Sequence, residues 1–390
     1  MKRIILLYFC IILIPAFSVE KKALFIPRDD LPFHQFSAKG DFSILPSDEL
    51  WPEVLQIVSS GDGSNVQIVA QNLPEFSLKD LNQVLWLKVE NLKELKDLWF
   101  YASDSSDFSN RIVFMVSQDP SQLREGEWCR VSLPLSSGQI WGNPDLSKLT
   151  SYQIWMNDRG GSPVTLQMGP VFLEESLPPS ALVFSFDDGW KTQISAAAPL
   201  MSQYGLKGTA YIIPALIGTP GYMDLDDLKR LINDYGWSVG SHYLEPINNF
   251  DSAEVRSLFE KQRQWFENAG ISMNDFSYPN GMHDQELLTI VPDYFRTGRT
   301  IIEFPESLPP GNPYKLRMLN VIPSTSLDVI ENRIQTMADR GELLILVFHK
   351  IESVSQFETE LTVERFEEIC RIAARSGREN LNMESVYPRF

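Results

Sequence analysis

Two adjacent carboxylates follow an apolar run in the second half of the chain. The run covers residues 181–186 and leads into Asp187, Asp188 and Gly189. Because consecutive side chains of an extended chain point to opposite sides, the two carboxylates cannot do the same work. One can hold a divalent cation while the other stays ionised near that charge and acts as a general base. A simple turn after a buried strand uses the same residue types, so this pattern alone favours the turn.

Three further strand-like runs end in polar groups that can do chemistry. They cover residues 237–241, 275–279 and 343–348. In a parallel βα array the carboxyl ends of the strands meet on one face, so these groups are expected to share one pocket. The polar groups at or just after the ends of these runs are His242, the segment Tyr278-Pro279-Asn280-Gly281, and His349.

The order of these motifs resembles that of the polysaccharide deacetylases, carbohydrate esterase family four, whose domain is also called the NodB homology domain. The matching segments, all in the C-terminal half, are Ser185-Phe186-Asp187-Asp188-Gly189, Gly240-Ser241-His242, Tyr278-Pro279-Asn280-Gly281 and Leu346-Val347-Phe348-His349. Any one of them is a weak signal, whereas all of them in the family's order are specific. The resemblance implies an α/β fold, a distorted βα barrel, and a hydrolase that cleaves the amide or ester bond of acetyl groups on a polysaccharide.

The resemblance also implies a role for each matched residue. Asp187 would be the general base that takes a proton from the attacking water, and His349 the general acid that protonates the leaving group. Asp188 and His242 would hold the divalent metal ion, which is zinc, manganese or cobalt in this interpretation. Tyr278 and the backbone N–H near Asn280 would contact the substrate and its oxyanion.

The metal motif departs from the family, because the usual second histidine is missing. Where the family has His-x-x-x-His-Pro, this chain has His242-Tyr243-Leu244-Glu245-Pro246. Glu245 is the substitute ligand that we expect, since positions three apart can share a face of a turn or helix. Two carboxylates would favour harder ions such as manganese or magnesium over zinc. In the alternative interpretation Glu245 only caps a turn and the metal is weak or lost, and His283 is a surface residue rather than a replacement.

The third motif lacks the arginine that orients the base in many relatives. Residues 277–279 read Ser-Tyr-Pro, so a later arginine would have to take this part. The candidates are Arg296, Arg299 and Arg317, of which Arg299 is the first choice; the alternative for each is an ordinary surface charge.

The N-terminus and the composition indicate an exported protein. Residues 1–18 have the basic start, short apolar run and small residues of a signal peptide, so we expect a secreted, periplasmic or cell-surface protein without membrane insertion. Asp and Glu outnumber Lys and Arg by 51 to 34, which gives a formal net charge of -17 and argues against nucleic-acid partners. A polysaccharide is the expected partner, and no pattern in the chain indicates an oligomeric state.

The first half has a different sequence pattern, in which short strand candidates are separated by polar turns. This spacing predicts an all-β sandwich, jelly-roll-like, over residues 19–175, and the barrel over residues 176–390. The sandwich resembles the galactose-binding-like modules that accompany glycan-active enzymes, which makes it a candidate carbohydrate-binding module. Trp141 is expected to be exposed, whereas most of Trp86, Trp99, Trp128 and Trp155 are expected to be core residues. The predicted strands are 65–70, 84–90, 98–103, 111–117, 128–133, 152–157 and 164–168.

Two other functions compete with deacetylation. A protein that kept the barrel but lost its metal would bind glycans without catalysis, although it would have no use for the base and the acid. A glycoside hydrolase would need two carboxylates that face one bond, and adjacent acids on one strand fit that chemistry poorly.

Overall fold

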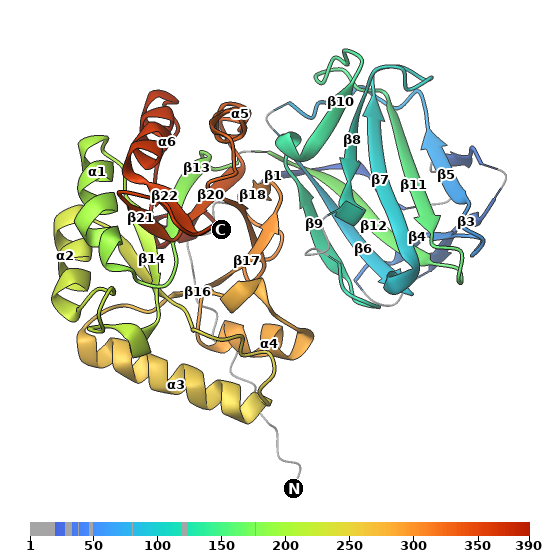
Figure 1. Ribbon diagram of the computed structural model, residues 1–390. Helices are drawn as coiled ribbons and strands as arrows, with labels where there is room; N and C mark the ends of the chain where they lie inside the picture. The colour runs from blue at the N-terminus through green and yellow to red at the C-terminus, as the bar shows by residue number, and fades with distance from the viewer. Residues whose placement is uncertain are drawn as a thin grey trace, which may run out of the picture.

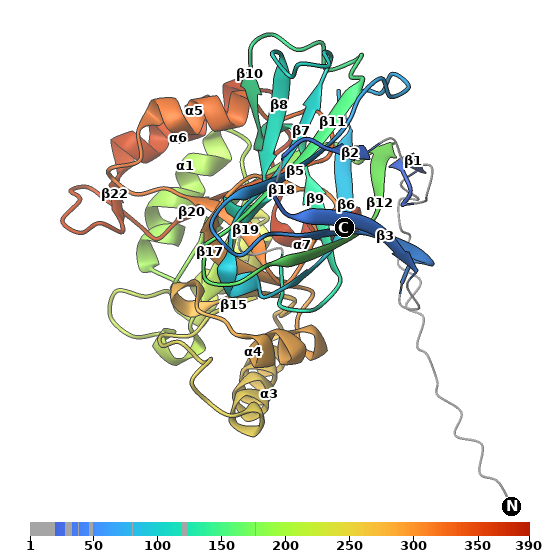
Figure 2. The same ribbon diagram turned by 90° about the vertical axis from the view of Figure 1, so that its right-hand side faces the viewer.

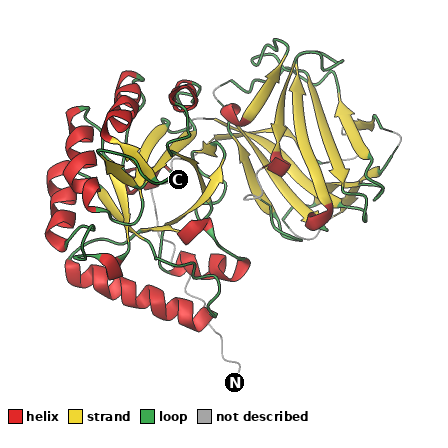
Figure 3. Ribbon diagram, viewed as in Figure 1, coloured by secondary structure: helices red, strands yellow, loops and turns green. Residues whose placement is uncertain are grey.

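The computed structural model describes residues 20–27, 33–37, 39–46, 50–79, 81–118, 123–175 and 177–390. Within them the chain forms a β-sandwich followed by a parallel βα barrel, which lie side by side (Figures 1 and 3). This confirms the predicted fold class. The predicted signal peptide, residues 1–18, lies outside the described residues.

The sandwich consists of two six-stranded antiparallel sheets. One sheet has the order β3-β4-β12-β6-β9, with β1 paired to β12, and the other has the order β10-β8-β7-β11-β5-β2. Apolar side chains alternate along these strands, and those that point between the sheets form one core. The strands are β1 (Glu20–Phe25), β2 (Phe33–Gln35), β3 (Asp41–Pro46), β4 (Glu53–Val58), β5 (Asn65–Ala70), β6 (Asn82–Glu90), β7 (Leu95–Ser103), β8 (Arg111–Met115), β9 (Cys129–Leu133), β10 (Gly138–Trp141), β11 (Ser151–Asp158) and β12 (Thr165–Glu175).

The tryptophans of the sandwich are placed differently from the prediction. Trp141 is 51% exposed, as expected, but it ends strand β10 rather than lying in a loop. The expectation that most of the others are core residues is wrong, because Trp86, Trp99, Trp128 and Trp155 are each only partly buried. Trp86, Trp99 and Trp155 alternate along their strands with core residues and therefore lie on the outer faces of the sheets.

The barrel closes because β13 pairs with both β14 and β20. All its strands are parallel except β18, which pairs antiparallel with the start of β20. Helices cover its outside, and the short C-terminal helix α7 packs against the side chains that point inside (Figures 1 and 2). The strands are β13 (Ala181–Phe186), β14 (Gly208–Ile212), β15 (Ser238–Ser241), β16 (Asp275–Ser277), β17 (Thr297–Glu303), β18 (Glu306–Ser307), β19 (Leu316–Asn320) and β20 (Glu342–Phe348), and a small parallel pair follows, β21 (Lys350–Glu352) and β22 (Glu360–Thr362).

The helices begin and end at the expected signals. Capping boxes at Asp224 and Asp251 start α2 and α3, and the left-handed Gly236 and Gly270 end them. Helix α5 stops at Gln335, and the guanidinium of Arg378 donates to the carbonyls of Gln335, Met337 and Ala338 just after it. The helices are α1 (Ala198–Gln203), α2 (Leu225–Tyr235), α3 (Ser252–Ala269), α4 (Gln285–Ile290), α5 (Leu327–Gln335), α6 (Val363–Arg375) and α7 (Met383–Val386). In the described part of the chain, none of them has the length and apolarity that crossing a membrane requires.

A buried ion pair ties β18 to β19 beside the closing strand. Nε and Nη2 of Arg317 donate to the carboxylate of Glu306, at 3.0 and 2.5 Å, and both side chains are at most 2% exposed. The carboxylate also accepts the backbone N–H groups of Ser307 and Arg317. Arg317 is therefore committed to this pair and is not the arginine that orients the base.

Removing one member of this pair should destabilise the barrel. We expect Glu306→Leu to lower the free energy of unfolding by about 3–5 kcal/mol, because it leaves a buried guanidinium without its carboxylate. The measurement is urea unfolding followed by circular dichroism. The double variant Glu306→Leu/Arg317→Leu is the control and should recover part of the loss; equal losses in both would contradict the role of the uncompensated charge.

Candidate active site

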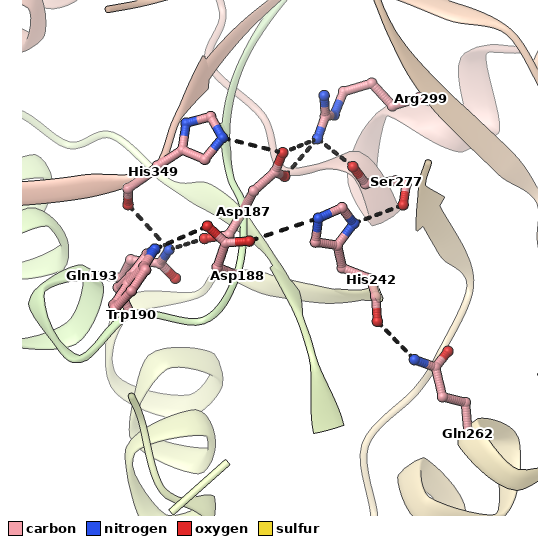
Figure 4. A network of polar contacts seen from close by, with 9 residues as sticks. All are labelled: Asp187, Asp188, Trp190, Gln193, His242, Gln262, Ser277, Arg299 and His349. Carbon is pink, nitrogen blue, oxygen red and sulfur yellow. Dashed lines mark hydrogen bonds and ion pairs between the residues drawn. The ribbon is translucent and has the colours of Figure 1, made fainter. Parts of the chain in front are cut away.

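Side chains that point into the barrel form a polar cluster at the carboxyl ends of its strands (Figure 4). In β13, Ala181 and Val183 face the interior, and alternation continues this row to Asp187 just past the strand. Likewise, Val347 in β20 faces the interior, and alternation along the chain places His349 on the same side. The strand pattern therefore aims residues that are far apart in sequence at one place.

Asp187 is the centre of the cluster. Nη2 of Arg299 donates to both oxygens of its carboxylate, at 2.5 and 2.6 Å, and Nε2 of His349 lies 3.9 Å from Oδ2 (Figure 4). Burial by itself would raise the pKa of Asp187, but the positive charge of Arg299 and the hydrogen bond from its guanidinium hold the pKa below its usual range. Asp187 is thus a buried carboxylate that is ionised at neutral pH.

Arg299 is fixed from several sides. Its side chain is 1% exposed, and Nη2 also donates to Oγ of Ser277, while Nη1 donates to the carbonyl of Thr300 at 3.2 Å. The guanidinium lies over the ring of Tyr211, 5.3 Å from its centre. Of the three candidate arginines, the structure brings this one to Asp187.

Asp188 lies on the other side of the strand exit, beside His242. Its φ of 73° turns the chain, and Oδ2 accepts the indole N–H of Trp190 at 2.9 Å. Nε2 of His242 is 3.7 Å from Oδ1 of Asp188. The two adjacent carboxylates therefore have separate partners, as their opposite directions predict.

The tautomer of His242 shows what this pair can hold. Nδ1 lies 2.8 Å from the carbonyl oxygen of Ser277, which can only accept, so Nδ1 carries the proton. In the neutral ring Nε2 is then an acceptor that faces the carboxylate, and two facing acceptors are suited to a cation between them. Their 3.7 Å separation is less than the sum of two metal–ligand bonds of about 2.0–2.2 Å each, so one ion can touch both.

The structure does not bring the expected third ligand to this pair. The side chain of Glu245 is exposed, and no three His, Cys, Asp or Glu groups of the described residues lie close enough together to hold an ion. His283 is engaged elsewhere, with Nδ1 2.8 Å from the carbonyl of Gly281. The described residues thus fit two positions of a coordination shell and no more.

The predicted substrate residues lie at the edge of the cluster. Tyr278 packs against Phe276 outside the barrel, and its hydroxyl donates to the carbonyl of Tyr314 at 3.0 Å, so its side chain turns away from Asp187. Asn280 is exposed and has a φ of 53°. The part of its backbone N–H in oxyanion binding stays a prediction.

Sequence reasoning missed four residues that support the cluster. Nε2 of Gln193 donates to the carbonyls of Asp187 and His349 and so links the two strand exits. Nε2 of Gln262 donates to the carbonyl of His242. Ser277 accepts from the guanidinium of Arg299, and Trp190 donates to the carboxylate of Asp188. Polar residues at inward positions of β16, and the residue just after the Asp-Asp-Gly turn, were the available signals.

Comparison with known proteins agrees with the motif order. Residues 174–294 match the family model described as polysaccharide deacetylase. The candidate polysaccharide deacetylase YxkH of Bacillus subtilis (strain 168) is 24% identical over 159 residues, which cover 40% of this chain and 56% of the relative. The chain thus spans about half the length of this curated relative, and the predicted resemblance is confirmed. Arg299 and His349 lie beyond residues 174–294, which the family model matches.

Solved structures resemble each part of the chain. The Xyl-CE4 domain of a multidomain xylanase from the hindgut metagenome of Trinervitermes trinervoides is 18% identical, with coverage of 54% of this chain and 94% of that one and a TM-score of 0.40. The family 4 carbohydrate esterase from Streptomyces lividans is 16% identical, with coverage of 53% of this chain and 93% of that one and a TM-score of 0.37. The family 11 carbohydrate-binding module of Lic26A-Cel5E from Clostridium thermocellum is 14% identical, with coverage of 40% of this chain and 95% of that one and a TM-score of 0.31.

Replacing Glu245 should leave cation binding unchanged. We expect Glu245→Ala to bind Zn²⁺, Mn²⁺ or Co²⁺ as tightly as the parent protein, because its exposed side chain does not reach Asp188 or His242. Titration calorimetry measures the affinity. The matched control is Asp188→Ala, which should lose binding by at least tenfold; a comparable loss in Glu245→Ala would show that this carboxylate does reach the ion.

Proposed function

We propose that this chain, in which residues 174–294 match the polysaccharide deacetylase family, removes acetyl groups from a polysaccharide with the help of a divalent metal ion. The observation that carries the proposal is the arrangement around the strand exit of β13. An ionised, buried Asp187 stands between a guanidinium and an imidazole, and an acceptor pair suited to a cation lies beside it.

Asp187 is placed to act as the base. Its two oxygens accept from Nη2 of Arg299, and Oδ2 also faces Nε2 of His349. An ionised carboxylate in this position can take a proton from a water that attacks an acetyl carbonyl. Arg299 orients the carboxylate and keeps it ionised, so we assign Arg299 as a positioning residue.

His349 is placed to act as the acid. Nε2 lies on the side of Asp187, and Nδ1 is buried without a hydrogen-bond partner among the described residues. When protonated, Nε2 can give its proton to the departing nitrogen or oxygen of the sugar, and acetate leaves. The backbone N–H near Asn280 would stabilise the negative charge on the former carbonyl oxygen.

Asp188 and His242 would hold the metal ion. When bound, a divalent ion supplies Lewis acidity that polarises the carbonyl and acidifies water. Trp190 fixes the direction of the Asp188 carboxylate through its indole N–H, and the carbonyl of Ser277 fixes the ring of His242. Zinc, manganese and cobalt are the ions that we propose to test.

The proposal includes the setting of the enzyme. We infer that residues 1–18 are a signal peptide, that residues 19–175 and 176–390 form separate domains, and that the mature protein acts on polysaccharide outside the cytoplasm. The negative net charge of -17 is compatible with a neutral or cationic glycan.

The first test measures metal content and acetate release together. Mature protein is analysed by mass spectrometry for bound metal, then assayed on acetylated chitooligosaccharides and acetylxylan with and without chelator. Asp187→Asn should lower kcat by about 10²–10⁴-fold and keep its metal, because only the base is lost. Asp188→Asn and His242→Ala should lose both the bound metal and the acetate-releasing activity.

Three results would contradict this proposal. Full activity in Asp187→Asn would remove the assigned base. Glycan binding without metal uptake or acetate release would favour the non-catalytic alternative. Shorter chains without acetate would favour glycoside hydrolysis.

The pH profile tests the part of Arg299. Because the folded pKa of Asp187 is lowered from its ordinary 3.8, the carboxylate stays ionised down to acidic pH in the parent protein. In Arg299→Gln the opposing effect of burial remains, so the pKa of Asp187 rises and the acid limb of kcat/KM moves to higher pH. Acetate release measured from pH 4 to 9 would show the shift.

Arg299→Lys is the matched control for this profile. It keeps a positive charge and should shift the acid limb less than Arg299→Gln does. An unmoved acid limb in a folded Arg299→Gln protein would show that Arg299 does not control the ionisation of the base.

A further inference from the structure

The outer face of one sandwich sheet has a pocket that the barrel chemistry does not use. The pocket has a volume of about 450 Å³, which is within the range of sites for small ligands. It lies on the sheet of β5, β7, β8 and β11, whose opposite face packs into the sandwich core. Aromatic and polar side chains line it, among them Gln67, Tyr101, Phe108, Arg111, Gln153 and Trp155.

An aromatic row crosses this outer face. Trp155 pairs with Trp99 across β11 and β7, with ring centres 5.7 Å apart, and stacks on Tyr101 at 6.1 Å. Arg111 continues the row, with its guanidinium 5.9 Å from the ring of Tyr101 and 5.2 Å from the ring of Trp141. These strands already bury their other face in the core, so the partly exposed rings of Trp99 and Trp155 have no part in closing the sandwich.

Polar groups beside the rings are arranged to make hydrogen bonds. Gln153 donates to the side-chain oxygen of Gln67 at 2.8 Å, which orients both amides at the pocket. Nε1 of Trp99 and Nε of Arg111 are buried without a hydrogen-bond partner among the described residues. The rim also has Phe36, which is 68% exposed.

The charges of the pocket are balanced. Arg111 contributes one positive charge, and no carboxylate of the described residues is paired with it. Asp107 contributes one negative charge, and hydrogen bonds from Ser109 and Ser105 lower its pKa to about 2. With a net charge of -17 on the whole chain, this face does not favour a polyanion.

We propose that this pocket binds a neutral polysaccharide chain, with pyranose rings stacked on Trp155 and their hydroxyls bonded to Gln67, Gln153 and Arg111. The flat apolar side of a pyranose fits an indole ring, and amides and a guanidinium suit the donors and acceptors at its edge. This goes beyond the proposed deacetylation, because it assigns a second site, on the other domain, that needs no metal.

The site is separate from the contacts that join the two domains. Those contacts involve Asn82 and Arg130 of the opposite sheet and Ser136 before β10. The row on β7 and β11 lies on the other sheet, which has the order β10-β8-β7-β11-β5-β2. A polymer held there would keep the barrel near its substrate, which raises the effective concentration of acetylated units.

Affinity electrophoresis of the full chain tests this site. Native gels contain xylan, hydroxyethyl cellulose or glycol chitin as neutral probes, or alginate as a polyanion, and all runs include chelator so that no metal is needed. We expect retardation by at least one neutral probe and none by alginate. Trp155→Ala should weaken that binding by roughly tenfold or more, and Gln67→Ala severalfold.

Trp86→Ala is the matched control. Trp86 is also a partly buried tryptophan, but it lies on the outer face of the opposite sheet, packed against Trp51. It should leave the binding unchanged, and thermal unfolding confirms that each variant folds. A second control is acetate release from a short soluble substrate, which Trp155→Ala should not change.

Three outcomes would overturn the proposal. The first is the absence of retardation by every neutral probe, and the second is retardation by alginate alone. The third is loss of binding in Trp86→Ala with normal binding in Trp155→Ala. Failure of deacetylation would leave the result intact, because binding is measured in the presence of chelator.

Discussion

The buried contact between Arg299 and Asp187 is the interaction on which the site depends. An ionised carboxylate inside a barrel is costly unless a charge and hydrogen bonds offset its lost hydration. One nitrogen of Arg299 contacts both oxygens of Asp187 and also the hydroxyl of Ser277, so the exits of β13 and β16 are both tied to β17. The proposed base is therefore ionised and held in place before any substrate arrives, which is the preorganisation that the proposed catalysis requires.

Much of this arrangement could be predicted from the sequence, because it follows from alternation along parallel strands. Apolar runs that end in polar residues identified β13, β15, β16 and β20, and the opposite directions of Asp187 and Asp188 predicted their separate partners. The ends of helix α3 also follow from the sequence, because Asp251 caps its start and Gly270 ends it through local interactions. Strands β1 to β4 and β10 were not predicted, since they are short or lie near sheet edges, where alternation is weak.

What the sequence could not decide was contact between distant residues. Three arginines were candidates to orient Asp187, and only the register of β17 against β16 and β19 places Arg299 inside and Arg317 outside the barrel. Glu245 was expected beside His242 from spacing alone, but the segment after β15 leaves its side chain exposed. Most tryptophans of the sandwich were expected in its core because large aromatic residues usually are buried, yet Trp86, Trp99 and Trp155 occupy positions whose neighbours along the strand already fill the core.

The charges of the cluster explain why one fold keeps two neighbouring carboxylates. Asp187 and Arg299 form a pair that is neutral overall, so they add little field to the rest of the pocket. Among the described residues, no such cation is paired with Asp188, whose partners are an indole N–H and the acceptor nitrogen of His242. One uncompensated negative charge beside a neutral imidazole attracts a divalent cation, and the sum would be one net positive charge. A site with that sign stabilises an oxyanion that forms nearby, whereas two uncompensated carboxylates would cancel the ion's charge. In the proposed reaction the guanidinium at Asp187 would therefore do more than orient the base, because it removes from the pocket a negative charge that would oppose the developing oxyanion.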